Sequence, residues 1–459
     1  MIRKILIANR GEIAIRIIRA CREMGIETVA VYSEADREAL HVQLADEAVC
    51  IGPANAKDSY LNMEQIISAT MITGADAIHP GFGFLSENSQ FVKLCEACHI
   101  TFIGPDSQTI EVLGNKAMAR QIMLNANVPV IPGCQKALTD AQEALDIAKK
   151  IGFPVIIKAV LGGGGKGMRV ASDEKEFQKA FLMAQKESGQ AFGDERMYLE
   201  HFVENPRHIE VQILADSYGN VIHLGERDCS IQRNHQKIIE ESPCIAIEES
   251  LREEMGRVAV LAAKASGYKN AGTIEFLLKE DGTFYFMEMN TRIQVEHPVT
   301  EWVTGIDLVK AQIRIADGET LKWKQEDIQI SGHAIECRIN AEDPSKNFRP
   351  CPGQITDLYL PGGKGVRIDS AIYSGCEISP YYDSMIAKLI VFAATRKEAI
   401  AKMHRALGEI IIEGIPTNRD FLYEIMERSD YQKGEITIQY LENVKREMDQ
   451  KKEAGENKA

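Results

Sequence analysis

Residues 273–292 read TIEFLLKEDGTFYFMEMNTR, a pattern that is typical of a β-hairpin. Both arms are rich in β-forming side chains, and Asp281-Gly282 between them is a dipeptide favoured in two-residue hairpin turns. A two-residue turn places Glu275 directly opposite Glu288. Because like charges that face each other destabilise a sheet, we expect this pair to bind a hard divalent cation such as Mg²⁺.

Side chains alternate along the second arm of this hairpin. One face is expected to carry Phe286, Glu288, Asn290 and Arg292. The other face, with Met287 and Met289, is expected to point into a core. The alternative is that the polar face is the solvated outer face of an antiparallel sheet.

The composition is that of a globular protein. The chain has 459 residues, of which 45% are hydrophobic and 26% charged, and its length suggests about three domains. A net charge of −14 argues against broad nucleic-acid binding, so an anionic ligand needs a local cluster of Lys and Arg. No stretch approaches about eighteen consecutive apolar residues, and the N-terminal apolar run is too short for a signal peptide. We therefore expect a cytoplasmic protein that binds neither membranes nor nucleic acid.

The ten cysteines show no disulfide framework, and a chain of this size does not need one, so we expect reduced thiols. Cys95, Cys98 and His99 match the spacing of a haem-attachment site. Because that chemistry needs export and a haem pocket, and neither is indicated, we interpret the two cysteines as reduced thiols on a helix.

The first part of the chain alternates between strand and helix patterns. Residues 4–8 and 29–32 are predicted strands on either side of a helix at 12–24. Further strand patterns near 75–78 and 101–103 indicate a parallel sheet, as in Rossmann-like domains. The first turn lacks the glycine triplet of a dinucleotide site, which disfavours a nicotinamide enzyme.

A glycine-rich loop follows in the next region. Residues 162–167 read GGGGKG and separate two predicted strands at 154–159 and 168–171. Bare glycine amides can approach phosphate oxygens, and Lys158 supplies a second cation near the loop. A P-loop is excluded because the lysine of this loop is followed by glycine and then by a strand. The loop is therefore either a phosphate-binding lid or a flexible surface hairpin.

Two later strands each carry a row of polar side chains. The first places His208, Glu210 and Gln212 on one face, where a lone histidine is more often structural than catalytic. The second places Glu336 and Arg338 on one face, where an isolated charge is more often exposed than functional. Considered singly, neither row identifies a site.

Four longer strings are more specific. They are IANRGEI at 7–13, HPGFGFLSEN at 79–88, GERDCS at 225–230 and EMNTRIQVEHP at 288–298. With these strings, and over nearly its whole length, the chain resembles the biotin carboxylase subunits of bacterial acetyl-CoA carboxylases, which are ATP-grasp enzymes. The resemblance implies that ATP phosphorylates bicarbonate to carboxyphosphate, and that the carboxyl group then passes to a ureido nitrogen of biotin.

The resemblance also implies a domain organisation of mixed α/β and α+β class. The expected parts are an N-terminal parallel-sheet domain at 1–112, an ATP-grasp domain at 113–330 with a mobile glycine-rich lid at about 131–203, a C-terminal α+β domain at 331–447 and a flexible tail at 448–459.

The same resemblance assigns the nucleotide and metal residues. The implied ATP-binding residues are Lys116, Lys158, Gly164, Gly165, Glu200, His201, Phe202, Val203, His208, Gln232, His235, Glu275 and Glu288. The implied ligands of Mg²⁺ or Mn²⁺ are Glu275, Glu288 and Asn290, which agrees with the metal expected from the hairpin.

The remaining implied roles concern bicarbonate and biotin. Bicarbonate is expected to bind Lys237, Arg292, Gln294 and the main chain of Val295. Glu296 is expected to be the general base that removes the bicarbonate proton, and Arg338 is expected to stabilise the enolate of biotin. The implied catalytic set is therefore Lys237, Arg292, Glu296 and Arg338.

The implied partners are a biotin carboxyl carrier protein, carboxyltransferase subunits and a second copy of the chain. No Met-Lys-Met tripeptide occurs, so biotin is expected on a separate carrier. Candidate dimer-interface positions are Arg16, Arg19 and Glu23.

Two further points concern the substrates. Where the family commonly has Glu-Lys-Tyr at the adenine segment, this chain has Glu-His-Phe at 200–202, which affects the expected nucleotide affinity. The acyl acceptor stays open, because subunits of pyruvate, 2-oxoglutarate or propionyl-CoA carboxylases use the same chemistry. A non-catalytic nucleotide sensor is disfavoured, since it would be expected to lose the acids or the base.

Overall fold

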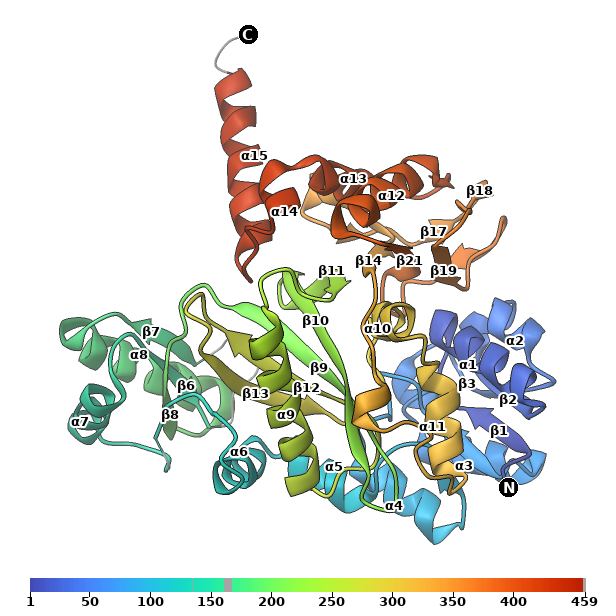
Figure 1. Ribbon diagram of the computed structural model, residues 1–459, viewed down its shortest axis with the longest axis horizontal. Helices are drawn as coiled ribbons and strands as arrows, with labels where there is room; N and C mark the ends of the chain where they lie inside the picture. The colour runs from blue at the N-terminus through green and yellow to red at the C-terminus, as the bar shows by residue number, and fades with distance from the viewer. Residues whose placement is uncertain (135, 161–166, 457–459) are drawn as a thin grey trace. The chain divides into compact units, whose positions relative to one another are not determined.

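The computed structural model describes residues 1–134, 136–160 and 167–456 (Figure 1). The described chain forms two compact units. The first contains Met1–Ala126, Arg207–Phe276 and Glu288–Ala459, and the second contains Asn127–Pro206 and Leu277–Met287. The predicted lid at about 131–203 falls within the second unit.

A five-stranded parallel sheet lies in the N-terminal part of the first unit, in the order β3-β2-β1-β4-β5. Ile5, Leu6 and Ile7 of its central strand are fully buried, as expected where helices cover both faces of a parallel sheet. This confirms the predicted N-terminal fold. The strands are β1 (Lys4–Ile7), β2 (Glu27–Ser33), β3 (Glu47–Gly52), β4 (Ala77–His79) and β5 (Thr101–Phe102). The helices are α1 (Gly11–Met24), α2 (Leu40–Leu44), α3 (Met63–Thr73), α4 (Ser89–Ala97), α5 (Ser107–Gly114) and α6 (Lys116–Asn125).

An eight-stranded sheet in the order β13-β12-β9-β10-β11-β14-β21-β19 joins the predicted second and third regions. Its strands are β9 (Arg207–Ala215), β10 (Val221–Arg233), β11 (Gln236–Ser242), β12 (Asn270–Leu278), β13 (Phe284–Asn290), β14 (His333–Asn340), β19 (Val366–Ser370) and β21 (Met385–Ala393). β11 and β14 pair with Glu240 opposite Glu336. β14 and β21 pair with Arg338 opposite Lys388. The pairing therefore brings buried charges from three strands together.

Helices and short strands complete the first unit. The helices are α9 (Glu249–Ala265), α10 (His297–Thr304), α11 (Leu308–Ala316), α12 (Arg396–Glu409), α13 (Arg419–Glu427), α14 (Ser429–Lys433) and α15 (Tyr440–Glu456). Two-stranded pairs are β15 (Glu342–Asp343) with β16 (Arg349–Pro350), β17 (Gly353–Gln354) with β20 (Glu377–Ile378), and β18 (Leu358–Tyr359) with β22 (Ile411–Ile412). The predicted tail from 448 is helical as far as Glu456, because this stretch is rich in Glu, Lys and Gln, which are good helix formers.

The second unit has its own small core. A three-stranded antiparallel sheet, β7-β6-β8, packs with α7 (Ala141–Ile151) and α8 (Glu174–Phe192). Its strands are β6 (Val155–Ala159), β7 (Met168–Ala171) and β8 (Met197–His201). The two strands predicted on either side of the glycine loop are confirmed. Gly164 and Gly165 themselves lie outside the described residues.

The hairpin of β12 and β13 forms, but its turn is one residue longer than predicted. The Lys279 N–H donates to Thr283 O at 2.8 Å, and the Gly282 N–H donates to Lys279 O at 3.1 Å. The loop therefore has three residues, ending at Gly282 with a φ of 83°, a left-handed conformation that favours glycine in such loops. The longer loop shifts the register beside the turn by one residue from the predicted one. Met289 is 6% exposed and Met287 is 37% exposed, against the prediction that both are buried.

Two general expectations can be compared directly with the described residues. No disulfide joins their cysteines, and Cys95 is buried in α4, as the reading of reduced thiols expects. None of their helices combines the length and hydropathy needed to cross a bilayer.

Candidate active site

Lys237 lies at the centre of a buried acidic cluster on the eight-stranded sheet. Its ammonium group contacts Glu210 on β9, Glu275 on β12 at 2.8 Å, and Glu296 just before α10 at 2.8 Å. Burial alone would lower the pKa of Lys237, but the three carboxylates raise it well above its usual value. Lys237 is therefore a permanent cation that holds together three carboxylates, two from strands and one from the segment before α10.

Glu296 is fully buried and lies between two cations. Its carboxylate accepts hydrogen bonds from Lys237 at 2.8 Å and from Arg338 Nη2 at 3.0 Å. Burial favours the protonated acid, but Lys237, Arg338 and Arg227 outweigh it and hold the pKa of Glu296 well below its usual range. Glu296 is thus an ionised carboxylate that can accept a proton from a group in direct contact with it.

Arg338 connects this carboxylate to a second one. Its Nε donates to Glu240 Oε1 at 2.6 Å, and the arginine side chain is 15% exposed. Burial raises the pKa of Glu240 to about 7 despite this partner. Arg338 is therefore not the exposed strand charge that an isolated residue of its type suggests, and β11 and β14 position it beside Glu296.

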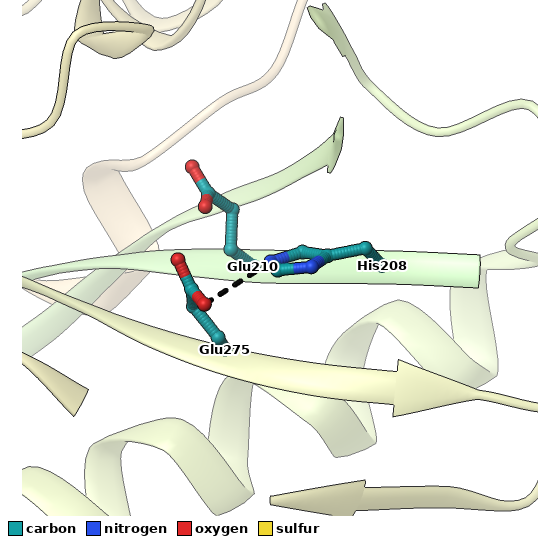
Figure 2. Close-up of side chains that lie close together, drawn as sticks. All are labelled: His208, Glu210 and Glu275. Atoms are coloured by element: carbon teal, nitrogen blue, oxygen red, sulfur yellow. Dashed lines mark ion pairs between the residues drawn. The ribbon is translucent and has the colours of Figure 1, made fainter. Parts of the chain in front are cut away.

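Glu275 raises the pKa of Glu288. The pairing of Lys279 with Thr283 beside the turn, however, does not set the two carboxylates directly opposite each other, against the prediction from the hairpin sequence. His208 Nε2 lies 3.2 Å from Glu275 Oε2 (Figure 2). Despite burial, Lys237 and His208 hold the pKa of Glu275 well below its usual range. Burial and the charge of Glu275 raise the pKa of Glu288, whose nearest cation among the described residues is Lys116 at 4.0 Å. The Glu288 carboxylate therefore lacks a close cation.

Besides the predicted set, two groups of side chains among the described residues could hold a metal ion here, and one of them consists of Glu210, Cys229 and Glu296. Figure 2 shows His208, Glu210 and Glu275, whose ligand atoms lie within 4.8 Å of one another. Glu210, however, already accepts hydrogen bonds from Arg227 and Lys237, and the histidine offers nitrogen. Mg²⁺ prefers oxygen ligands.

The predicted metal set fits better than the one drawn in Figure 2. The Glu288 carboxylate is repelled by Glu275, and a divalent cation between them would remove that repulsion. Asn290 Oδ1 accepts only a 3.2 Å bond from Arg292 among the described residues. Glu275, Glu288 and Asn290 therefore supply oxygen atoms, and the negative charge of Glu288 is the one that lacks a close cation.

The segment between β13 and α10 forms a connected network. Arg292 Nε donates to Glu87 at 2.8 Å, and its Nη1 donates to Gln294 Oε1 at 3.0 Å. Gln294 Nε2 in turn donates to Glu275 Oε1 at 3.2 Å. The Val295 carbonyl accepts a hydrogen bond from Lys388. Of the four predicted bicarbonate residues, Arg292, Gln294 and Lys237 are thus connected through Glu275, and Val295 follows Gln294 in the chain.

The predicted nucleotide residues of the second unit form a group of their own. Lys158 on β6 is paired with Glu200 on β8. His201 Nδ1 lies 3.1 Å from Gly152 O, and the Phe202 N–H donates to Pro154 O at 2.8 Å. Val203 is buried. The substitutions at His201 and Phe202 therefore leave this segment anchored within its own sheet.

Three other predicted ATP residues are less buried than the carboxylates of the cluster, and one of them, Gln232, pairs with Lys237 across β10 and β11. Lys116 at the start of α6 is 91% exposed. His235 is exposed in the turn between β10 and β11, with a φ of 65°. Gln232 is partly buried, and its side chain donates to Cys229 O at 2.8 Å.

Sequence reasoning missed several residues that organise the site. Arg227 is fully buried, and it donates to Glu210 and to Gln212, at 2.8 Å in the second case. The alternation of His208, Glu210 and Gln212 already placed Glu210 on the right face and was the available signal. Glu240 gave no such signal, because its importance depends on strand pairing across about a hundred residues.

Comparisons with known proteins agree along the whole chain. Three domain families match: "Biotin carboxylase, N-terminal domain" at 1–110, "Carbamoyl-phosphate synthase L chain, ATP binding domain" at 115–324 and "Biotin carboxylase C-terminal domain" at 336–443. Biotin carboxylase 1 of Bacillus subtilis is 58% identical over 443 residues, which cover 96% of this chain and 98% of that protein.

Solved structures show the same similarity. The biotin carboxylase of Campylobacter jejuni is 52% identical with a TM-score of 0.90, covering 96% of this chain and 99% of that one. The biotin carboxylase domain of the Hydrogenobacter thermophilus 2-oxoglutarate carboxylase, solved as a dimer with MgADP, ADP and bicarbonate, is 52% identical with a TM-score of 0.89, covering 96% of this chain and 98% of that one. The chain therefore belongs to the biotin carboxylase family of ATP-grasp proteins, and it is an ATP-dependent carboxylase.

Proposed function

We propose that this enzyme carboxylates biotin on a biotin carboxyl carrier protein, using ATP and bicarbonate through carboxyphosphate, as the first half-reaction of acetyl-CoA carboxylase in fatty acid synthesis. The observation that carries the proposal is Glu296, a buried carboxylate kept ionised between Lys237 and Arg338. A base flanked by two cations suits a reaction in which an anion must bind and then lose a proton.

Bicarbonate would bind beside Glu296. Arg292 offers a planar fork that matches a carboxylate-like anion, and Lys237, Gln294 and the Val295 N–H complete the seat. Bicarbonate in this seat would compete for Lys237, weaken its bond to Glu296 and so make Glu296 a stronger base. Glu296 would then take the bicarbonate proton while the anion attacks the terminal phosphate of ATP.

Each unit carries residues that we assign to nucleotide binding. Lys116 and His208 belong to the first unit, and Lys158, Glu200 and the main chain at 201–203 belong to the second. Mg²⁺ or Mn²⁺ held by Glu275, Glu288 and Asn290 would supply charge neutralisation at the phosphate oxygens. Residues 164–165 would close over the phosphates and exclude water from the intermediate.

Biotin would bind beside Arg338. When a ureido nitrogen loses its proton, negative charge moves to the ureido oxygen, and a guanidinium donor fixed in place stabilises that charge. The bonds from Arg338 to Glu240 and Glu296 fix its plane before biotin arrives.

The direct test measures bicarbonate-dependent ADP formation with and without free biotin. We expect slow ADP formation with bicarbonate alone and faster formation when biotin is added, together with carboxybiotin. Nucleotide binding without any bicarbonate-dependent turnover would contradict the proposal and favour a sensor.

There is a second candidate for the acyl acceptor. The 52% identity to a 2-oxoglutarate carboxylase domain supports the alternative that this enzyme belongs to another two-part carboxylase. Affinity purification of the tagged chain from its own cells should recover the carrier protein and the carboxyltransferase subunits. The transferase recovered identifies the acceptor.

We also propose a cytoplasmic homodimer. Of the three candidate interface positions, Arg19 and Glu23 are exposed, whereas Arg16 is buried and donates to Glu301 and Asp307 of its own chain. Arg16 is therefore not available for a direct interface contact. Arg19→Glu should shift the enzyme towards monomer in sedimentation velocity, and an unchanged dimer would exclude this helix.

A further inference from the structure

Lys388 is a charged residue in an otherwise apolar buried strand. It lies in the middle of β21, where its neighbours Leu389, Ile390 and Val391 are buried, and its own side chain is completely buried. Lysine is almost never fully buried unless it is paired, because removing an ammonium group from water is costly. An apolar side chain would be the less costly choice, so the charge needs a reason.

The Lys388 ammonium group has three partners from different parts of the first unit. It lies 3.0 Å from Glu12 on α1 and 3.8 Å from Asp369 on β19. It also donates a hydrogen bond of 2.8 Å to the carbonyl oxygen of Val295. The two carboxylates compensate the charge, and the third partner is the main chain of the predicted bicarbonate seat.

The position of that carbonyl matters for the chemistry. The Val295 carbonyl belongs to the peptide plane that joins Val295 to Glu296, and peptide units are rigid. A fixed plane limits the ψ of Val295 and the φ of Glu296, the torsions that connect it to the Val295 N–H on one side and to the Glu296 side chain on the other. The segment lies outside any strand and precedes α10, so no sheet ladder orients it.

We propose that Lys388 is a positioning residue for bicarbonate: from the face of the sheet that it shares with Arg338, it holds the Val295–Glu296 peptide in the orientation that binds the anion and aims the base. This inference rests on the proposed function of the site. Lys388 touches no reacting atom and acts through the peptide that it holds.

The test compares Lys388→Met with Lys402→Met. Lys402 on α12 donates a hydrogen bond to the carbonyl oxygen of Phe392 on β21. Its replacement therefore also removes a hydrogen bond from a lysine to a backbone carbonyl. We expect Lys388→Met to raise the apparent KM for bicarbonate about tenfold or more, the effect of losing a charged hydrogen bond, and to leave the KM for ATP nearly unchanged. Lys402→Met should change neither KM.

Loss of Lys388 also leaves Glu12 buried without its cation, which can destabilise the fold. The double variant, Glu12→Gln with Lys388→Met, removes this uncompensated carboxylate as well. It can therefore be assayed even if the single variant Lys388→Met does not fold. The double variant should recover thermal stability but keep the raised KM for bicarbonate, whereas Glu12→Gln alone should keep a normal KM. A normal KM for bicarbonate in the double variant would overturn the proposal, as would an equal rise in the KM for ATP.

Amide hydrogen exchange separates this inference from the proposed function. A peptide covering residues 291–298 should exchange faster in the double variant than in Glu12→Gln, whether or not the enzyme is assayed. If exchange is faster in the double variant but the unsubstituted protein shows no bicarbonate-dependent turnover, Lys388 still positions the peptide and the proposed function is wrong. Normal exchange and normal KM in an active enzyme would reject Lys388 alone.

Discussion

Glu296 shows at the scale of one residue how burial and pairing act against each other. Removal from water favours the protonated form, but Lys237 at 2.8 Å and Arg338 at 3.0 Å favour the carboxylate and dominate. At Glu240 burial outweighs pairing, and the pKa of this carboxyl is raised to about 7. These two carboxylates, which share Arg338, therefore differ in proton affinity because Glu296 has a second close cation in Lys237.

The Glu288 carboxylate can be tested without disturbing the fold. Its pKa is raised by burial and by Glu275, so Glu288→Gln removes a repulsion as well as a proposed metal ligand. We expect turnover to fall at least about a hundredfold, and the melting temperature without metal to stay level or rise. Glu280→Gln, at an exposed position in the loop of the same hairpin, should change neither quantity. Retained turnover with a lower melting temperature would return Glu288 to a structural role.

Arg338→Gln should separate the two half-steps of the reaction. We expect carboxybiotin formation to fall about a hundredfold, as for other donors that stabilise an oxyanion, while bicarbonate-dependent ADP formation without biotin continues. Because Arg338 is paired with two buried carboxylates, we also expect a loss of stability of about 3 kcal/mol.

Arg349→Gln provides the control for this variant, since Arg349 is an exposed arginine of the same region. It should leave both activities and the stability unchanged. A parallel loss of both activities in Arg338→Gln at a temperature where the variant is folded would remove Arg338 from the biotin side of the site.

At the scale of an element, the second unit depends on close packing beside the glycine loop. The Ala159 N–H donates to Gly167 O at 3.0 Å, which closes β6 and β7 around the loop. Gly167 has a φ of 71°, and a Cβ there would lie 2.8 Å from Ala159 Cβ. The glycine at this position thus meets both a conformational and a steric requirement.

A matched pair of glycines separates these two requirements. Gly193 at the end of α8 also has a φ of 71°, but no atom lies within 4 Å of the added Cβ. We expect Gly193→Ala to cost about 1 kcal/mol from the left-handed backbone alone. Gly167→Ala should cost clearly more, as measured by urea unfolding. Equal costs would mean that the neighbouring strand adapts to the methyl group.

The lid itself has a separate test based on its sequence. Replacing Gly164 and Gly165 together by Ala restricts the backbone conformations that a closing loop needs. We expect a higher apparent KM for ATP and little change in stability. Unchanged ATP kinetics would identify the loop as a surface hairpin.

At the scale of the whole molecule, buried neutral histidines determine how stability responds to acid. Burial lowers the pKa of His41 from 6.5 to about 4 and that of His79 to about 3. Below pH 6.5 the unfolded chain takes up protons that the folded chain does not, so stability falls as the pH drops from 6.5 towards 4. Glu241 adds a second window: burial opposes ionisation there, but His333 and Arg396 lower its pKa from 4.5 to about 2, so its contribution is lost between those values.

Urea unfolding at several pH values checks this expectation. Glu240, whose pKa in the folded chain is raised to about 7, acts in the opposite direction as the pH falls below that value, so the histidine contribution is measured as a difference between variants. His41→Gln should lose less stability than the unchanged chain between pH 6.5 and 4. His99→Asn is the control, because His99 is exposed and Asn tolerates its φ of 56°. A slope unaffected by His41→Gln would mean that the pKa of His41 is the same in the folded and the unfolded chain.

The sequence by itself determined the elements whose signal is local. Alternation along β9, β13 and β14 placed His208, Glu288 and Arg338 on their polar faces, because side chains in a strand point alternately to opposite sides. The βαβ pattern predicted the parallel sheet, and the string at 288–298 carried the family. The hairpin turn was missed by one residue, because Asp-Gly occurs both in two-residue turns and before the left-handed glycine of a three-residue loop.

Only the tertiary structure decided which charges meet. Glu240, Arg338 and Lys388 come from three strands that are distant in sequence, and their contacts depend on the pairing of β11, β14 and β21. The same is true of Arg16, which the sequence offered as an interface residue and the fold pairs with Glu301. A buried charge is stable only beside its counter-charge, and that partner is fixed by the packing of the whole unit, which no local pattern contains.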